Sequence, residues 1–144
     1  MSGTLVLTVG WSLIVGACLF AWWKGGQPER WGGALNLVIN LIGTPLYMLP
    51  ITSRQTGVLA LDGLLAFGLL LLAVRYASPW IGVAMLLQAI QFMLHTYYYV
   101  MELQHDPLFA IVNNLVLVGI VLCIIAGTIW SWIKRGPRPA TAQG

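Results

Sequence analysis

Residues Trp80 to Met101 read WIGVAMLLQAIQFMLHTYYYVM, the most polar of the long apolar runs in this chain. Polar side chains recur there at helical spacing and continue into the next residue; they are Gln88, Gln91, His95, Tyr98, Tyr99 and Glu102. The spacing places them along one side of a helix. In lipid such a stripe has to face protein, water or a ligand, because polar side chains are costly in hydrocarbon.

The composition requires lipid as the main solvent. Of the 144 residues, 59% are hydrophobic and 8% are charged, whereas a soluble domain carries about 25% charged residues. A chain of this length cannot bury so much apolar surface in a fold that faces water. The net charge of +3 comes with only seven Lys and Arg residues, which membrane topology explains better than a nucleic-acid partner does.

Short polar breaks separate five apolar runs, at residues 5–23, 34–51, 58–74, 80–101 and 108–133. Each is close to the roughly 20 residues that cross a bilayer as a helix. We therefore predict an all-α integral membrane protein in which residues 1–144 form one domain of five transmembrane helices, with 134–144 as a basic, Pro-rich cytoplasmic tail. Pro45 and Pro50 should kink the second helix, and a re-entrant loop is the alternative for that segment.

The distribution of Lys and Arg predicts the orientation in the membrane. With five spans, six of these residues share one side: Lys24, Arg30, Arg75, Lys134, Arg135 and Arg138. Arg54 alone falls on the other side. Because positively charged loops favour the cytoplasm, the N-terminus should lie outside and the C-terminus inside. Most tryptophans gather at the expected cytoplasmic interface, namely Trp22, Trp23, Trp31, Trp80, Trp130 and Trp132.

Small residues at four-residue spacing mark two expected helix-packing faces. The first run carries Thr8, Ser12 and Gly16, and the fifth carries Gly119, Cys123 and Gly127. Such spacing lets helix backbones approach closely in lipid. The helix that meets each face belongs either to this chain or to another integral membrane subunit, which includes a second copy of the chain.

Counting residues outward from the turns predicts which polar groups share a depth. A turn centred near Ala77 sets Asp62 opposite Phe92, and the following turn sets His95 opposite Asn114. Since each helical residue rises about 1.5 Å, one polar intramembrane cluster is expected at this level. Its members are Asp62, Gln88, Gln91, His95, Asn113 and Asn114.

The expected Asp62–His95 pair has two interpretations. A buried carboxylate needs a partner, water or a proton, so the pair is either a polar knot that orders helix packing or a proton-handling or ligand-binding site. No metal site is expected. His95 is the one plausible axial ligand for haem or a chlorophyll-type pigment, because His105 lies about 15 Å higher on a continued helix.

No catalytic motif occurs in the chain, and we do not expect an enzyme. The pattern of Asp62, Arg75, Trp80, Gln88 and His95 resembles small uncharacterised multi-span proteins of proteobacteria. The resemblance implies a bacterial inner-membrane location and no activity.

Three functions remain as hypotheses from the sequence. The first is a non-enzymatic accessory or structural subunit that packs against a larger membrane protein complex. The second is a small-molecule, haem or pigment-binding membrane protein with a polar pocket around Asp62 and His95, and the third is an oligomeric proton or solute conduit. No cofactor is expected under the first hypothesis, and lipid is a partner under all three.

Overall fold

The computed structural model contains five α-helices and describes residues 3–46, 48 and 50–136, without the side chains of residues 51 and 52. The all-α fold of five helices is thereby confirmed. The helices are α1 (Gly3–Lys24), α2 (Gln27–Leu46), α3 (Ile51–Tyr76), α4 (Pro79–Val100) and α5 (Pro107–Lys134).

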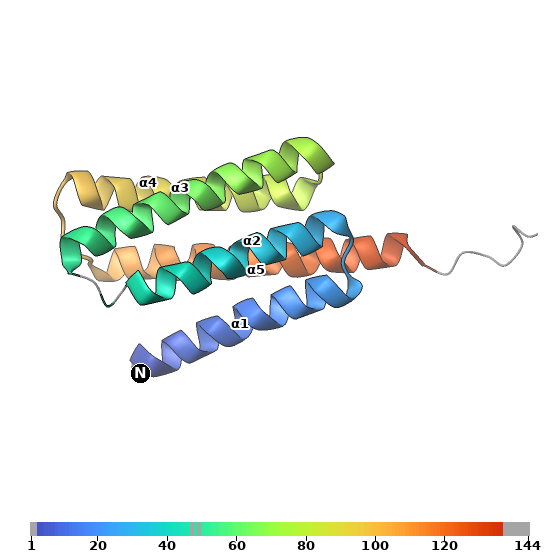
Figure 1. The fold of residues 1–144 in the computed structure, drawn as a ribbon, viewed down its shortest axis with the longest axis horizontal. Coiled ribbons are helices and arrows are strands. Elements are labelled where there is room, and N and C mark those ends of the chain that lie inside the picture. The colour runs from blue at the N-terminus through green and yellow to red at the C-terminus, as the bar shows by residue number, and fades with distance from the viewer. Residues whose placement is uncertain (1–2, 47, 49, 137–144) are drawn as a thin grey trace, which may run out of the picture.

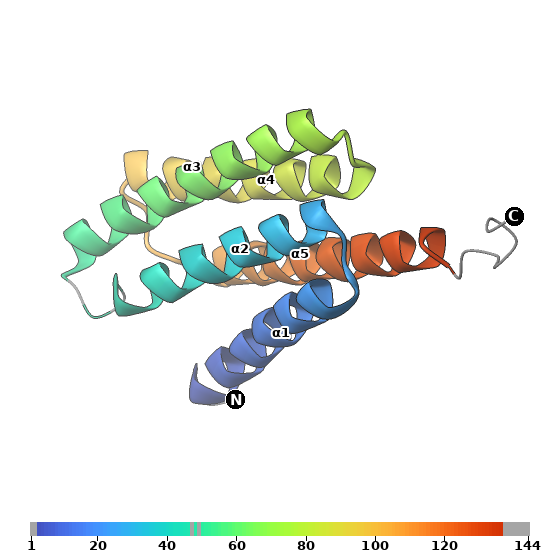
Figure 2. The same cartoon turned by 45° about the vertical axis from the view of Figure 1, so that its right-hand side comes forward.

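The five helices lie side by side and alternate in direction along the chain (Figure 1). α3 and α4 form a hairpin, α2 packs against α3, and α5 packs against α4 and α1. α1 is outermost, and its N-terminal part diverges from the other helices (Figure 2). We call the end that carries the α2–α3 and α4–α5 loops the His95 end, and the opposite end the Trp80 end.

Two tight turns at the Trp80 end set these directions. After α3, Ala77 adopts φ 48°, and its N–H donates to the carbonyl of Ala73 at 2.9 Å. Pro79 then begins α4, because its fixed φ suits the first helical turn. Between α1 and α2, a side chain on Gly25 would lie 2.3 Å from the carbonyl oxygen of Ala21, so this turn requires glycine.

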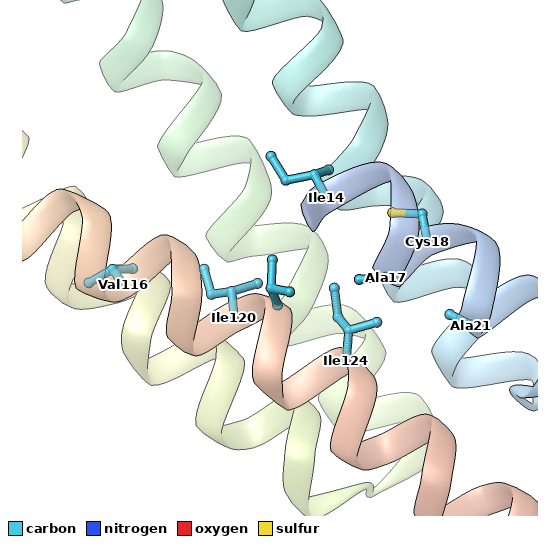
Figure 3. Packing of buried hydrophobic residues seen from close by; sticks show 8 residues of the cluster. Ile14, Ala17, Cys18, Ala21, Val116, Ile120 and Ile124 are labelled. Atoms are coloured by element: carbon cyan, nitrogen blue, oxygen red, sulfur yellow. The ribbon is translucent and has the colours of Figure 1, made fainter. Parts of the chain in front are cut away.

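The core is divided into two apolar clusters. The larger joins the C-terminal half of α1 to α5 and contains Ile14, Ala17, Cys18, Ala21, Val116, Ile120, Val121 and Ile124 (Figure 3). The smaller joins α3 to α4 through Leu65, Leu69, Ile81 and Ala84. Together they hold the hairpin, the central helices and the base of α1 in one bundle.

The outer surface is apolar, as lipid contact requires. Leu19, Val74 and Leu115 are 66%, 77% and 65% exposed. Within the described residues, three helices are long and apolar enough to cross a membrane: α1, most of α3, and α5. These spans indicate an integral membrane protein in contact with the bilayer. α2 and α4 have similar lengths but lack an equally apolar stretch.

The second helix differs from the expected segment 34–51. It begins at Gln27 within the expected loop and ends at Leu46, with Pro45 in its last turn. Pro50 lies outside α2 and is the N-cap residue of α3, so the prediction that it kinks the second helix is wrong. Hydropathy marks where a helix is apolar, but Glu29 starts this one by accepting a hydrogen bond from the N–H of Gly26 at 2.8 Å.

Candidate functional site

A buried ionisable pair joins α3 to α4 toward the His95 end. Nδ1 of His95 pairs with Oδ2 of Asp62, and Nε2 of Gln88 donates to Oδ1 of Asp62 at 3.2 Å. Asp62 and Gln88 are buried, at 7% and 1% exposed. Both carboxylate oxygens are therefore engaged, and because Nδ1 of His95 is held, its Nε2 is the nitrogen that can meet a ligand.

The remaining members of the expected cluster are separated from this pair. Nε2 of Gln91 donates to Oδ1 of Asn113 at 3.1 Å, which joins α4 to α5. Asn114 is exposed on the outer side of α5. The structure thus places Asp62, Gln88 and His95 in one group and Gln91 with Asn113 in a second, and Asn114 belongs to neither. Counting residues outward from the turns predicts the height of each residue along its helix. The rotation of α5 about its own axis decides which asparagine faces inward.

Aromatic rings cover the pair where α4 meets α5. The ring of Phe109 lies 5.1 Å from that of His95 and 4.1 Å from that of His105, between centroids. Tyr98 is buried, and its hydroxyl donates to Oδ1 of Asp106 at 2.8 Å. The same Asp106 oxygen accepts the N–H of Phe109 at 2.8 Å and so caps α5. This cap holds the rings against His95.

A pocket of about 180 Å³ opens among these groups. α3, α4, α5 and the loop before α5 supply its lining residues, which are Arg54, Gln55, Val58, His95, Tyr98, Tyr99, His105, Phe109 and Asn113. Val58 and the aromatic rings are the apolar lining groups, and the other lining residues can donate hydrogen bonds. A few polar groups set in an apolar wall are typical of a small-molecule site.

The sequence interpretation missed the contribution of α3 to this pocket. Arg54 entered it only as a charge that reports topology, and Gln55 was not considered. The same count about Ala77 that pairs Asp62 with Phe92 also pairs Gln55 with Tyr99. In the structure, the neighbouring hydroxyl groups of Thr56 and Tyr99 lie 3.4 Å apart, so the signal for this missed part of the site was present.

Two groups in the α4–α5 loop have shifted pKa values. The N–H of Phe109 and the hydroxyl of Tyr98 lower the pKa of Asp106, because both bonds favour the carboxylate. Partial burial lowers the pKa of His105, and the nearby His95 and Arg54 lower it further, whereas Asp106 opposes them. His105 therefore faces surroundings in which a second positive charge is unfavourable.

A separate polar contact lies at the Trp80 end and was not expected from the sequence. Glu29 of α2 is 3% exposed, and its Oε1 accepts the indole N–H of Trp80 from α4 at 3.0 Å. The Trp80 ring fits against Gly32 and Gly127, where an added Cβ would lie 2.7 Å and 2.5 Å from ring atoms. Trp80 thus points into the bundle, whereas it was expected at the membrane interface.

The two small-residue faces have different surroundings. On α5, Gly119 lies against Leu87, Gly127 against Trp80, and Cys123 packs on the α3–α4 cluster. On α1, Thr8, Ser12 and Gly16 are exposed, and an added Cβ on Gly16 would meet nothing within 4 Å. The α5 face is therefore filled within this chain, while the α1 face points away from the bundle.

Two asparagines one turn apart on α2 bond to each other. Nδ2 of Asn40 donates to the backbone and side-chain oxygens of Asn36, at 2.8 and 3.2 Å. Within the described part of the chain, Nδ2 of Asn36 is buried without a hydrogen-bond partner.

The pocket is small and lies beside an aromatic ring. Its volume of about 180 Å³ is below the about 300–1,000 Å³ typical of sites for drug-sized ligands. Phe109 also covers the ring of His95. Among residues 3–46, 48 and 50–136, no three His, Cys, Asp or Glu side chains come together as metal ligands would.

Comparison with known proteins adds no relative to this description. No family model, curated protein or solved structure matches the chain. The chain stands as a small helical protein with three candidate membrane spans. Function has to be inferred from its own geometry.

Proposed function

We propose that this chain is an integral membrane protein that binds a small molecule in the pocket at the His95 end. The observation that carries the proposal is the open pocket of about 180 Å³ beside the buried Asp62–His95 pair. A polar group that serves packing alone needs partners but no adjoining space. Here the groups beside the pair, Tyr98 and Asn113, line a cavity as well as bonding to neighbours.

The pair prepares His95 for binding. Asp62 holds the imidazole through Nδ1, and Gln88 holds Asp62. Such support fixes the ring orientation and leaves Nε2 for a ligand, as outer partners do for liganding histidines in general. The pair thus acts as a rigid base beneath an open pocket, and binding needs no rearrangement of α3 against α4.

The proposal includes five spans, with the N-terminus outside and the C-terminus in the cytoplasm of a bacterial inner membrane. α2 and α4 lie between apolar helices and alternate with them in direction (Figure 1). If α1, α3 and α5 cross the bilayer, α2 and α4 occupy the same depth, and their polar side chains are shielded by neighbours. The pocket then opens toward the outer surface.

Filling the pocket tests the proposal. Val58 lines it, so Val58→Trp should displace a bound molecule. Val74→Trp is the matched control, because Val74 is 77% exposed on the same helix. Native mass spectrometry of protein extracted from its own membranes should show a small-molecule adduct on the parent and control proteins but not on Val58→Trp. Identical spectra for all three would contradict the proposal.

A second candidate function is an accessory subunit of a larger membrane complex, which the α1 face favours. The hydroxyl groups of Thr8 and Ser12 bond to carbonyls of their own helix at 2.7 and 2.8 Å. Together with Gly16 they leave a smooth, exposed surface suited to another helix in lipid. In mild native extraction, Gly16→Leu should release the chain from a larger species, whereas Val118→Leu on exposed α5 should not. A lone monomer for the parent protein would contradict this candidate.

A further inference from the structure

We infer that the ligand of this pocket is an oxyanion, a carboxylate or phosphate, on a small apolar body. The inference rests on the proposed function and specifies the class of ligand. It stands on the arrangement of charged groups around the pocket, the direction of α3 and the shape of the apolar wall.

The described lining of the pocket carries a positive charge and no negative one. Arg54 supplies the charge, and none of the described lining residues is acidic. His95 and His105 also line the pocket, and their rings can donate hydrogen bonds. Two carboxylates that contact lining residues are already hydrogen-bonded: Asp62 to Gln88 and His95, and Asp106 to Tyr98 and the N–H of Phe109. A cationic ligand would therefore meet like charge, while an oxyanion would meet donors.

The electrostatic surroundings of His105 are also positive. Burial lowers the pKa of His105 most, and the Coulombic effects of His95 and Arg54 lower it further, each by more than Asp106 raises it. A bound oxyanion would act on this pKa in the opposite direction. Arg54 supplies the planar fork of donors that suits carboxylate and phosphate groups.

The start of α3 adds a fixed dipole of the same sign. Arg54 and Gln55 stand in its first turns, so the positive end of this helix lies beside the pocket. Its N-cap residue is Pro50, which has no side-chain acceptor for the first N–H groups. The dipole and Arg54 act in the same direction on a bound anion.

The remaining wall selects a small apolar body. Val58 and the ring of Phe109 are apolar lining groups, and Phe109 packs edge-on against Tyr98 and His105 at 5.0 and 4.1 Å between centroids. A single ring or a short alkyl chain suits a volume of about 180 Å³. The oxyanion itself can come from a soluble organic acid or from the headgroup of an anionic lipid.

Three probes of equal shape separate charge from size. Isothermal titration of detergent-purified protein with benzoate, benzamide and benzylamine compares an anion, a neutral molecule and a cation. Benzoate should bind roughly tenfold or more tightly than the other two, as one charge-assisted hydrogen bond provides. Arg54→Gln should remove the preference and Arg54→Lys should keep most of it. Arg75→Gln, at the exposed far end of α3, should change nothing.

The outcomes separate this inference from the proposed function. Equal binding of benzoate and benzamide, or a preference that survives Arg54→Gln, would overturn the oxyanion while leaving a ligand pocket. Binding of none of the three would remove the pocket function as well. In nanodiscs, loss of benzoate binding with phosphatidylglycerol but not with phosphatidylcholine would assign the oxyanion to a lipid headgroup. Equal benzoate binding in both lipids would assign it to a soluble acid.

Discussion

At the scale of single residues, the Asp62–His95 pair is the feature that most needs compensating contacts, because both of its groups are ionisable and largely buried. Both side chains are about one-tenth exposed, and each engages the other across the α3–α4 hairpin. Removing one partner of a buried pair leaves a charge or a donor without a partner. Replacing both partners by apolar residues leaves only apolar packing at the site. Stability and ligand binding should therefore respond differently to single and double substitutions.

Asp62→Leu should destabilise the protein by about 3 kcal/mol, since it leaves His95 unpaired. Asp62→Leu combined with His95→Phe should recover most of that loss, because two apolar side chains of similar volume replace the pair. Denaturant unfolding in detergent measures both. A double variant no more stable than Asp62→Leu would show that the pair itself supplies the stability. Benzoate binding should be lost in both the single and the double variant.

Asp106 predicts a dependence of stability on pH. Its pKa lies below the usual 3.8, because the N–H of Phe109 and the hydroxyl of Tyr98 favour the carboxylate. A lowered pKa contributes stability that is fully present above pH 3.8 and is lost as the pH falls through the pKa of the folded protein. Asp106→Ala should therefore lower the thermal midpoint at pH 7.

The deficit of Asp106→Ala relative to the parent should shrink as the pH falls below 3.8. Thermal scans from pH 7 to pH 3 measure this. Glu102→Gln is the control, because it removes a carboxylate from the same loop without removing the cap of α5. A constant deficit for Asp106→Ala at every pH would contradict the role assigned to its charge.

At the scale of elements, Trp80 joins α4 to α2 and α5. An added methyl group at Gly127 would lie within 2.6 Å of three atoms of the Trp80 ring, which also bonds to Glu29. Gly127→Ala should therefore displace the ring and cost about 1–3 kcal/mol by overpacking. Urea unfolding in detergent provides the measurement.

Gly82→Ala is the matched control for this overpacking. It lies on the same helix as Trp80, and an added Cβ would meet nothing within 4 Å. This change should be neutral or stabilising by up to about 1 kcal/mol, because it reduces the freedom of the unfolded chain. Equal effects of Gly127→Ala and Gly82→Ala would show that the ring adjusts freely.

At the scale of the whole molecule, the number of spans decides which side each loop faces. With five spans, the α3–α4 turn and the α4–α5 loop lie on opposite sides of the membrane. If only α1, α3 and α5 crossed, α4 would stay on one side, and both loops would share it. Under the proposed orientation, the Trp80 end faces the cytoplasm, and lysines lie over tryptophan rings there: Lys24 at 4.6 Å from Trp132 and Lys134 at 5.1 Å from Trp130.

Single cysteines distinguish these arrangements. In a background of Cys18→Ala and Cys123→Ala, Gln104→Cys should react with a membrane-impermeant maleimide from outside, whereas Ser78→Cys should react only after permeabilisation. Labelling of both positions from the same side would exclude the five-span topology. Both sites lie in turns between helices, where Gln104 is exposed and Ser78 is half-buried. Labelling of the denatured protein in parallel separates the effect of side from that of burial.

Much of the fold could be predicted from residue chemistry alone. The apolar composition requires lipid, the polar spacing from Gln88 to His95 predicts one face of a helix, and the turn at Ala77 predicts the level of Asp62. The polar face and the level of Asp62 follow from the periodicity of the sequence and from the rise per residue of a helix. Both are properties of a single helix and do not depend on its neighbours. The start of α2 was missed because Glu29, a charged residue, lies inside the bundle.

The amino-acid sequence by itself determined an all-α chain of five helices, an apolar exterior and a polar face on the fourth helix. Only the tertiary structure decided that Asn113 faces inward and Asn114 outward, that Arg54 lines the pocket, and that Trp80 bonds to Glu29. The physical reason is rotation. Adjacent residues on a helix point about 100° apart, so contacts depend on how each helix turns about its axis, and that turn is chosen only when side chains from several helices pack together.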